Sequence, residues 1–122
     1  MNIIDLDILR PEKRIVRLHG VDIDVSFIPC GITFDIDRLT QELQKISIKK
    51  IEQNGAETRR AFELAVEICA TFAGRDHPEL TKEWFMANVD ATQVNVFSNA
   101  IKDALIASYK GVADYGKKAE GT

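Results

Sequence analysis

The sequence predicts an α+β domain in which a short N-terminal antiparallel β-hairpin, with a third short strand as an open alternative, precedes a bundle of about four helices. Three observations predict this fold. Apolar and polar residues alternate along residues 21–27, which is the period of a half-buried strand. Apolar residues then recur at helical spacing along residues 56–73 and again along 91–110. Helix-start signals also precede two of the predicted helices.

Length and composition indicate one globular domain spanning residues 1–122. The chain is 45% hydrophobic and 29% charged, which suits a single core. A net charge of −3 without a concentrated basic face argues against a nucleic-acid binder. No run approaches the roughly 20 apolar residues of a membrane span. Cys30 and Cys69 have no metal or redox motif around them and are expected to be reduced thiols. We therefore expect a cytoplasmic protein.

The chain divides into an N-terminal arm (1–12), a β element (13–36), a helical body (37–110) and a mobile tail (111–122). Within the β element, His19-Gly20 is the predicted hairpin turn, because glycine permits positive φ. The side chains expected on the buried face of the hairpin are Val21, Ile23, Val25 and Phe27.

Residues 29–31 interrupt this ladder, because proline lacks an amide hydrogen and glycine bends freely. Alternation resumes at Ile32, Phe34 and Ile36, which allows either a third strand or an extended approach to the first helix. Asp37 is the predicted N-cap of that helix, and Asn54-Gly55 its predicted end. The buried face of this helix is expected to carry Leu39, Leu43 and Ile46.

The remaining helices have clearer boundaries. Residues 56–73 form the most apolar helix, which Gly74 should close, and such a helix belongs in the centre of the bundle. Thr81 is placed to cap a short helix over 82–88, and Asp90 with Gln93 forms a capping box for a last helix that should end at Gly111. Two hydrophobic staples accompany these caps, namely Leu80 with Phe85 and Val89 with Val94.

Residues that could carry chemistry do not form a recognisable site. His19 and His77 are 58 positions apart, and neither has a metal-ligand partner at helical spacing. The acids at positions 22, 24, 35 and 37 lack the spacing of a calcium-binding loop. No glycine-rich phosphate loop is present. A nucleophilic Cys30 is disfavoured by the acidic side chains that follow it. We therefore expect no enzymatic activity, catalytic residue, metal or cofactor.

Several apolar residues are left over once the predicted core is filled. Trp84, Phe85 and Met86 cannot all face one core, so Met86 should reach the surface. Either neighbouring elements cover the other surplus residues, or these residues form an association surface. The candidate partner-binding residues are Ile48, Ile51, Met86, Val96 and Ala100.

Three segments together resemble tail assembly chaperones of long-tailed, siphovirus-like phages and prophages. They are RIVRLHGVDIDVSFIPCGIT, TRRAFELAVEICATFAG and LTKEWFMANVDATQVNVFSNAIKDALIAS. The third contains an L-T-x-E-W-like helix start at residues 80–84 and an N-V-D-x-x-Q-like cap at residues 88–93. The resemblance covers residues 14–110.

This resemblance implies an ATP-independent protein of the bacterial host cytoplasm that is absent from the mature virion. Its partner would be the tape measure protein, with the tail tube protein as a further partner. The client would bind as a helix in a groove. A homo-oligomer is compatible with this role, whereas nucleic acid and membrane partners are not expected. Three other readings remain open: a generic helical adaptor or regulatory protein, a minor structural tail protein, and a small enzyme that uses Cys30.

Overall fold

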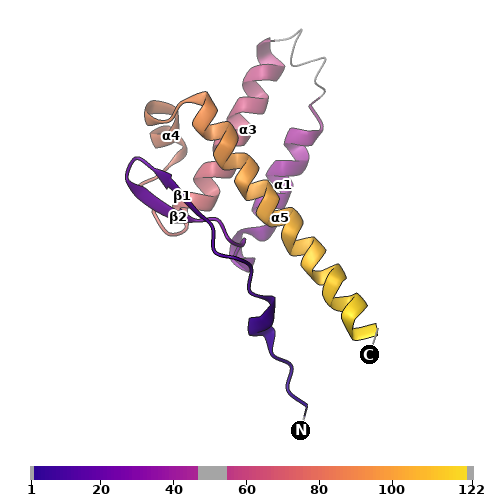
Figure 1. Cartoon of the computed structure of the whole chain (residues 1–122). Coiled ribbons are helices and arrows are strands. Elements are labelled where there is room, and N and C mark those ends of the chain that lie inside the picture. Colours follow the sequence, from indigo (N-terminus) through magenta and orange to yellow (C-terminus); the bar gives the residue numbers. More distant parts are fainter. Residues whose placement is uncertain (1, 47–54, 121–122) are drawn as a thin grey trace.

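The computed structural model describes residues 2–46 and 55–120 and has a β-hairpin followed by helices, which confirms the predicted α+β class (Figure 1). The hairpin lies beside the lower end of α3 in Figure 1, and α5 crosses the other helices. The elements are η1 (Leu6–Leu9, a 3₁₀ turn), β1 (Ile15–Leu18), β2 (Val21–Asp24), α1 (Cys30–Gln44), α3 (Gly55–Gly74), α4 (Lys82–Asn88) and α5 (Ala91–Glu120).

The predicted hairpin and its turn are confirmed. Strands β1 and β2 pair antiparallel with Leu18 opposite Val21. His19 and Gly20 have φ angles of 50° and 77°, the two positive values that a two-residue turn requires for the right-handed twist of its strands. The His19 ring then anchors the turn to α4. Its Nε2 lies 2.7 Å from the Asn88 carbonyl oxygen, and the ring meets Trp84 edge-on.

The alternation of the second strand ends earlier than predicted. Ile23 and Val25 are buried, but Phe27 is 49% exposed and the next residue, Ile28, is buried in its place. The change of phase follows a turn at Ser26, whose amide donates to the Asp24 carboxylate. The expected position of Phe27 on the buried face is therefore wrong.

The third strand does not form, because residues 30–44 are helical. Ile32, Ile36, Leu39 and Leu43 are spaced by four, three and four residues, so they share one helical face, and Ile36 is fully buried. Phe34 falls on another side and is 86% exposed. In this segment the period-two alternation coincided with a helical repeat, and packing against α3 and α5 selected the helix.

The predicted boundaries of the first helix are also wrong. Pro29 occupies the N-cap position instead of Asp37, and its carbonyl accepts hydrogen bonds from the Ile32 amide and the Thr33 hydroxyl. Proline fits here because the first helical turn needs no intrahelical amide donor. The helix ends at Gln44, and Gly55 is the first residue of α3 and not a stop for α1.

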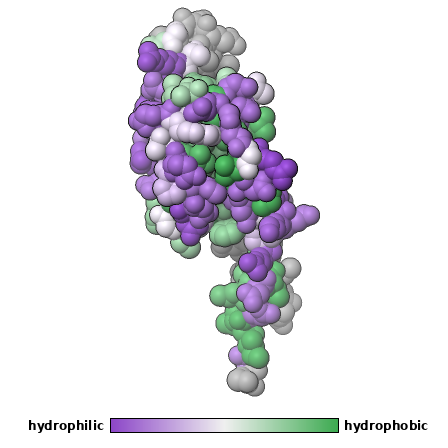
Figure 2. All heavy atoms as spheres, turned by 90° about the vertical axis from the view of Figure 1, so that its left-hand side faces the viewer, coloured by the Kyte–Doolittle hydropathy of each residue, from purple (hydrophilic) through white to green (hydrophobic). Residues whose placement is uncertain are grey.

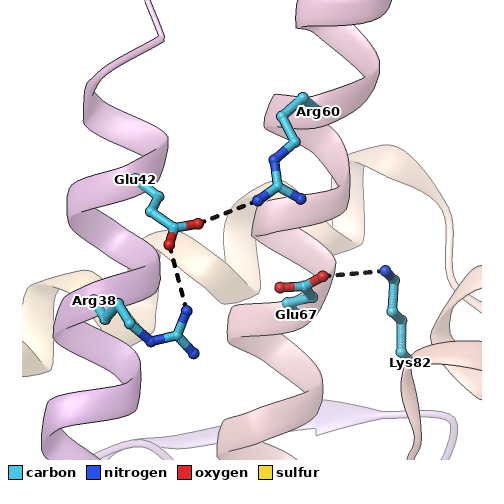
Figure 3. Close-up of polar contacts among 5 residues, drawn as sticks. All are labelled: Arg38, Glu42, Arg60, Glu67 and Lys82. Atoms are coloured by element: carbon cyan, nitrogen blue, oxygen red, sulfur yellow. Dashed lines mark hydrogen bonds and ion pairs between the residues drawn. The ribbon is translucent and has the colours of Figure 1, made fainter.

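Helix α3 is the central element, as predicted, and it contacts α1, α4 and α5. Its narrow polar strip holds neighbouring helices through ion pairs (Figure 3). Glu42 of α1 accepts from Arg38 at 3.4 Å and from Arg60 of α3 at 3.2 Å, while Lys82 of α4 donates to Glu67 of α3 at 3.1 Å. Pairs of this exposure contribute at most about 1 kcal/mol each, so they orient the helices more than they stabilise them.

Both predicted cap arrangements are confirmed. The Thr81 hydroxyl accepts from the Trp84 amide at 3.1 Å. In the capping box, the Gln93 amide donates to Asp90 Oδ1 at 2.8 Å, and the Asp90 amide donates to Gln93 Oε1 at 3.1 Å. The staple residues Leu80, Phe85 and Val94 are buried and Val89 is partly buried.

We expect Asp90→Ala to lower the free energy of unfolding by about 1 kcal/mol, because it leaves the Gln93 amide without its acceptor. Urea denaturation followed by circular dichroism measures the change. Asp103→Ala is the matched control, since it removes the same carboxylate from the exposed middle of α5 and should stay within about 0.5 kcal/mol of wild type. Equal losses in the two variants would contradict the capping role.

Helix α5 does not end at Gly111 as predicted but continues to Glu120. A glycine inside a helix costs only about 1 kcal/mol relative to alanine. Residues 112–120 contain no proline, so one glycine is not enough to terminate the helix. Much of the region expected to be a mobile tail is thus helical.

The N-terminal arm extends away from the body (Figure 1). Its apolar side chains stay in solvent, and green surface covers most of the lower projection in Figure 2, at the level of this arm. The exposed apolar residues of the arm are Ile3, Ile4, Leu6, Ile8 and Leu9.

Candidate partner-binding groove

The residues predicted to bind a partner do not gather in one place. Met86 on α4 and Val96 on α5 are 52% and 64% exposed, so they reach the surface as predicted. Ala100 is only 8% exposed and belongs to the core. It borders the buried face of α5, one residue before the fully buried Ile101, and its exposure was wrongly predicted. Ile48 and Ile51 lie outside the described residues.

The structure instead presents a groove between α1 and α5, with a volume of about 260 Å³. Each helix contributes residues at positions i, i+3, i+4 and i+7, so two matching helical stripes line the groove. The α1 stripe is Asp37, Thr40, Gln41 and Gln44, and the α5 stripe is Lys102, Leu105, Ile106 and Tyr109.

The groove combines an apolar side with polar edges. Leu105 is buried, whereas Ile106 and Tyr109 are 63% and 54% exposed and leave apolar surface in water. The Asp37 carboxylate accepts from the Gln41 side-chain amide at 2.9 Å. Partial loss of hydration, and then the neighbouring Asp37 carboxylate, raise the pKa of Tyr109 above its ordinary value. The phenol is thus a neutral hydrogen-bonding group at physiological pH.

The hydroxyl of Thr40, a residue that lines the groove, makes no hydrogen bond. The residue is 7% exposed, and its Oγ1 has no hydrogen-bond partner. Leaving a buried hydroxyl unpaired costs about 1–3 kcal/mol. A helical threonine commonly avoids this cost by donating to the carbonyl four residues earlier. Thr40 lines the groove, but its Oγ1 is closed off from solvent, so a bound chain would reach this hydroxyl only after neighbouring side chains had moved.

Phe34 extends the apolar surface beyond the groove. It precedes Asp37 and Gln41 by three and seven residues, so it lies on the same side of α1 as the groove-lining stripe. An 86% exposed phenylalanine on an ordered helix is unfavourable in water unless another chain covers it. Phe34 and the eight lining residues are therefore taken together as the candidate surface.

Sequence reasoning missed this groove, although a signal for it was present. Phe34 is out of step with the buried repeat of α1, and Ile106 directly follows Leu105, a buried residue of the α5 repeat. Apolar residues on the wrong side of an amphipathic helix mark a second face. The pairing of the two faces across a groove depends on the α1–α5 crossing, which no local pattern specifies.

The two cysteines lie in different environments. Cys30 is exposed at the first residue of α1, and Cys69 is buried in α3 with its Sγ 3.6 Å from the Val94 carbonyl oxygen. Burial raises the pKa of Cys69 to about 12. The contacts of the two histidines are with other residues: His19 contacts Asn88 and Trp84, and His77 contacts Glu79.

Comparisons with known proteins identify no relative: no family model, curated protein or solved structure matches the chain. Within residues 2–46 and 55–120, no three His, Cys, Asp or Glu side chains group closely enough to hold a metal ion. Over the same described ranges, no helix has both the length and the apolar character to cross a membrane.

Proposed function

We propose that this chain is a non-enzymatic binding protein that receives an amphipathic helix of a partner in the groove between α1 and α5. Within this class, we propose a tail assembly chaperone that holds the tape measure protein before the tail tube forms. The first step rests on the groove, and the second on the resemblance of residues 14–110 to that family.

The observation that carries the binding role is the apolar surface that the groove leaves exposed to water. Ile106 and Tyr109 leave apolar surface in water along the groove, and exposed Phe34 adds apolar surface on the same side of α1. A further helix laid along α1 and α5 would bury the apolar residues. The polar edge groups, such as Lys102 and Asp37, would then set the register of the bound helix.

This arrangement suits reversible holding of a client. The groove is short, with two helical turns from each wall, so its contacts with a helix are modest. Such an interface lies at the low end of specific interface sizes, where complexes are transient. A long helical client that carries repeated apolar stripes could bind many copies of the chaperone and later be released by polymerising tube protein.

The test is co-expression with fragments of a phage tape measure protein, followed by pull-down and affinity measurement. Ile106→Glu should weaken binding at least about 30-fold, since it places a charge in the centre of the apolar contact. Val96→Glu is the matched control, because it lies on the same helix, is 64% exposed against 63% for Ile106, and does not line the groove. Both variants should retain wild-type circular dichroism.

The outcomes separate the two parts of the proposal. Loss of binding with Val96→Glu alone would move the client surface to the other side of α5. If both variants still bind the client, the groove is not the client site. Absence of any binding to tape measure fragments would contradict the chaperone assignment, and detection of the chain in purified virions would favour a structural tail protein.

A further inference from the structure

The N-terminal arm carries a preformed docking element that its own chain leaves uncovered. Asp5 caps the 3₁₀ turn η1 by accepting from the Asp7 amide at 3.0 Å, and the Arg10 amide donates to the Asp7 carbonyl at 3.1 Å. Residues three apart eclipse each other in a 3₁₀ turn, so Leu6 and Leu9 share one face. They are 65% and 48% exposed.

The apolar residues of this arm are unusual because they are exposed to solvent. The turn buries none of its residues, and the flanking Ile3 and Ile4 are 76% and 73% exposed. An isolated turn of this length has little stability in water, and apolar surface on this scale marks a contact with another surface. Arg10 is extended (φ −63°, ψ 125°) and precedes Pro11, and the arm runs away from the body that it leaves (Figure 1).

The α1–α5 groove of a second copy has the complementary properties. It offers apolar contact at Ile106 and Tyr109. Lys102 lines the groove and forms no ion pair with the side chains that the structure describes. The acidic side chains of the arm, Asp5 and Asp7, flank Leu6 and provide a matching charge.

We propose that two copies of this chain exchange N-terminal arms, each arm placing Leu6 and Leu9 in the α1–α5 groove of the other copy. The exchange is isologous, because each copy supplies one arm and one groove, and it closes as a two-fold dimer. Two docked arms would remove on the order of 1,200 Å² from water, the lower end of specific protein interfaces. The exchange concerns this chain alone, and a docked arm would compete with the proposed client helix for the same groove.

Sedimentation velocity of the full chain over a range of concentrations tests the exchange. We expect a monomer–dimer equilibrium whose dissociation constant rises at least about 30-fold in the double variant Leu6→Asp/Leu9→Asp, and by a similar factor in Ile106→Glu. Val96→Glu should leave the equilibrium unchanged, since Val96 is as exposed as Leu6 but lies outside both surfaces. All the altered side chains are at least 48% exposed, so the fold should persist.

Mixing the two defective variants distinguishes exchange from an arm that folds back on its own groove. The arm variant retains a working groove and Ile106→Glu retains a working arm, so the mixture should form a heterodimer through one intact contact. Either variant alone should remain monomeric at the same concentration. A wild-type monomer at all concentrations, a dimer that the arm variant leaves intact, or a mixture that forms no heterodimer would each overturn the proposal.

Discussion

Phe85→Ala is expected to lower the free energy of unfolding by about 3–5 kcal/mol, the range for removing a fully buried phenylalanine. Phe85 is 0% exposed and lies where α4 meets the core. Its ring contacts Trp84 edge-on at a centroid distance of 5.2 Å and Phe97 at 6.2 Å. The substitution removes these ring contacts, leaves a cavity, and takes away the staple partner of Leu80.

Urea denaturation followed by circular dichroism measures this loss. A small domain has only about 5–15 kcal/mol of stability, so the variant should unfold at a much lower urea concentration or be partly unfolded without urea. Met86→Ala is the matched control, because Met86 is the next residue on the same helix and is 52% exposed. It should change stability by less than about 0.5 kcal/mol. Similar losses in the two variants would show that α4 does not depend on this core contact.

The second large effect concerns the cysteines. Burial raises the pKa of Cys69 from 9.0 to about 12, so its thiolate fraction near neutral pH falls about 1,000-fold below that of an ordinary thiol. Because the thiolate is the reactive form and Cys69 is also buried, alkylation of Cys69 in the folded protein should be much slower than that of exposed Cys30. In urea, the two cysteines should react at similar rates.

Mass spectrometry after timed labelling with iodoacetamide separates the two sites. Cys30→Ser should remove the fast phase and leave the slow one, which assigns each phase to its residue. Labelling of Cys69 at the rate of Cys30 in the folded state would contradict the burial of α3. If Cys30 instead reacts much faster than a cysteine in an unfolded peptide, an activated nucleophile would replace the non-enzymatic binding proposal.

Elements specified by neighbouring residues could be predicted from the sequence. The His19-Gly20 turn fixes a two-residue hairpin, because both positive φ angles fall on residues that tolerate them. Thr81 and the Asp90–Gln93 box define their helix starts through hydrogen bonds that span only three residues. The central position of α3 could be predicted because the apolar arc of this helix is wide.

Elements whose local signals allow two structures could not be predicted. Residues 32–36 fit a strand by alternation and a helix by the spacing that continues to Leu39 and Leu43. Contact with α3 and α5 favours the helix, because only that conformation buries Ile36 and Leu39 together. Gly111 likewise carries a stop signal that is too weak to end α5.

The sequence by itself determined the α+β class, the hairpin turn, the caps of α4 and α5 and the central place of α3. The turn and the caps depend on interactions between residues close in the chain, and the place of α3 follows from the wide apolar arc of its own sequence. Only the tertiary structure decided where α1 begins, that Ala100 is buried, and that Thr40 and Ile106 line one groove. The physical reason is that a groove belongs to two helices about 65 residues apart in the chain, and their relative position follows from packing of the whole core.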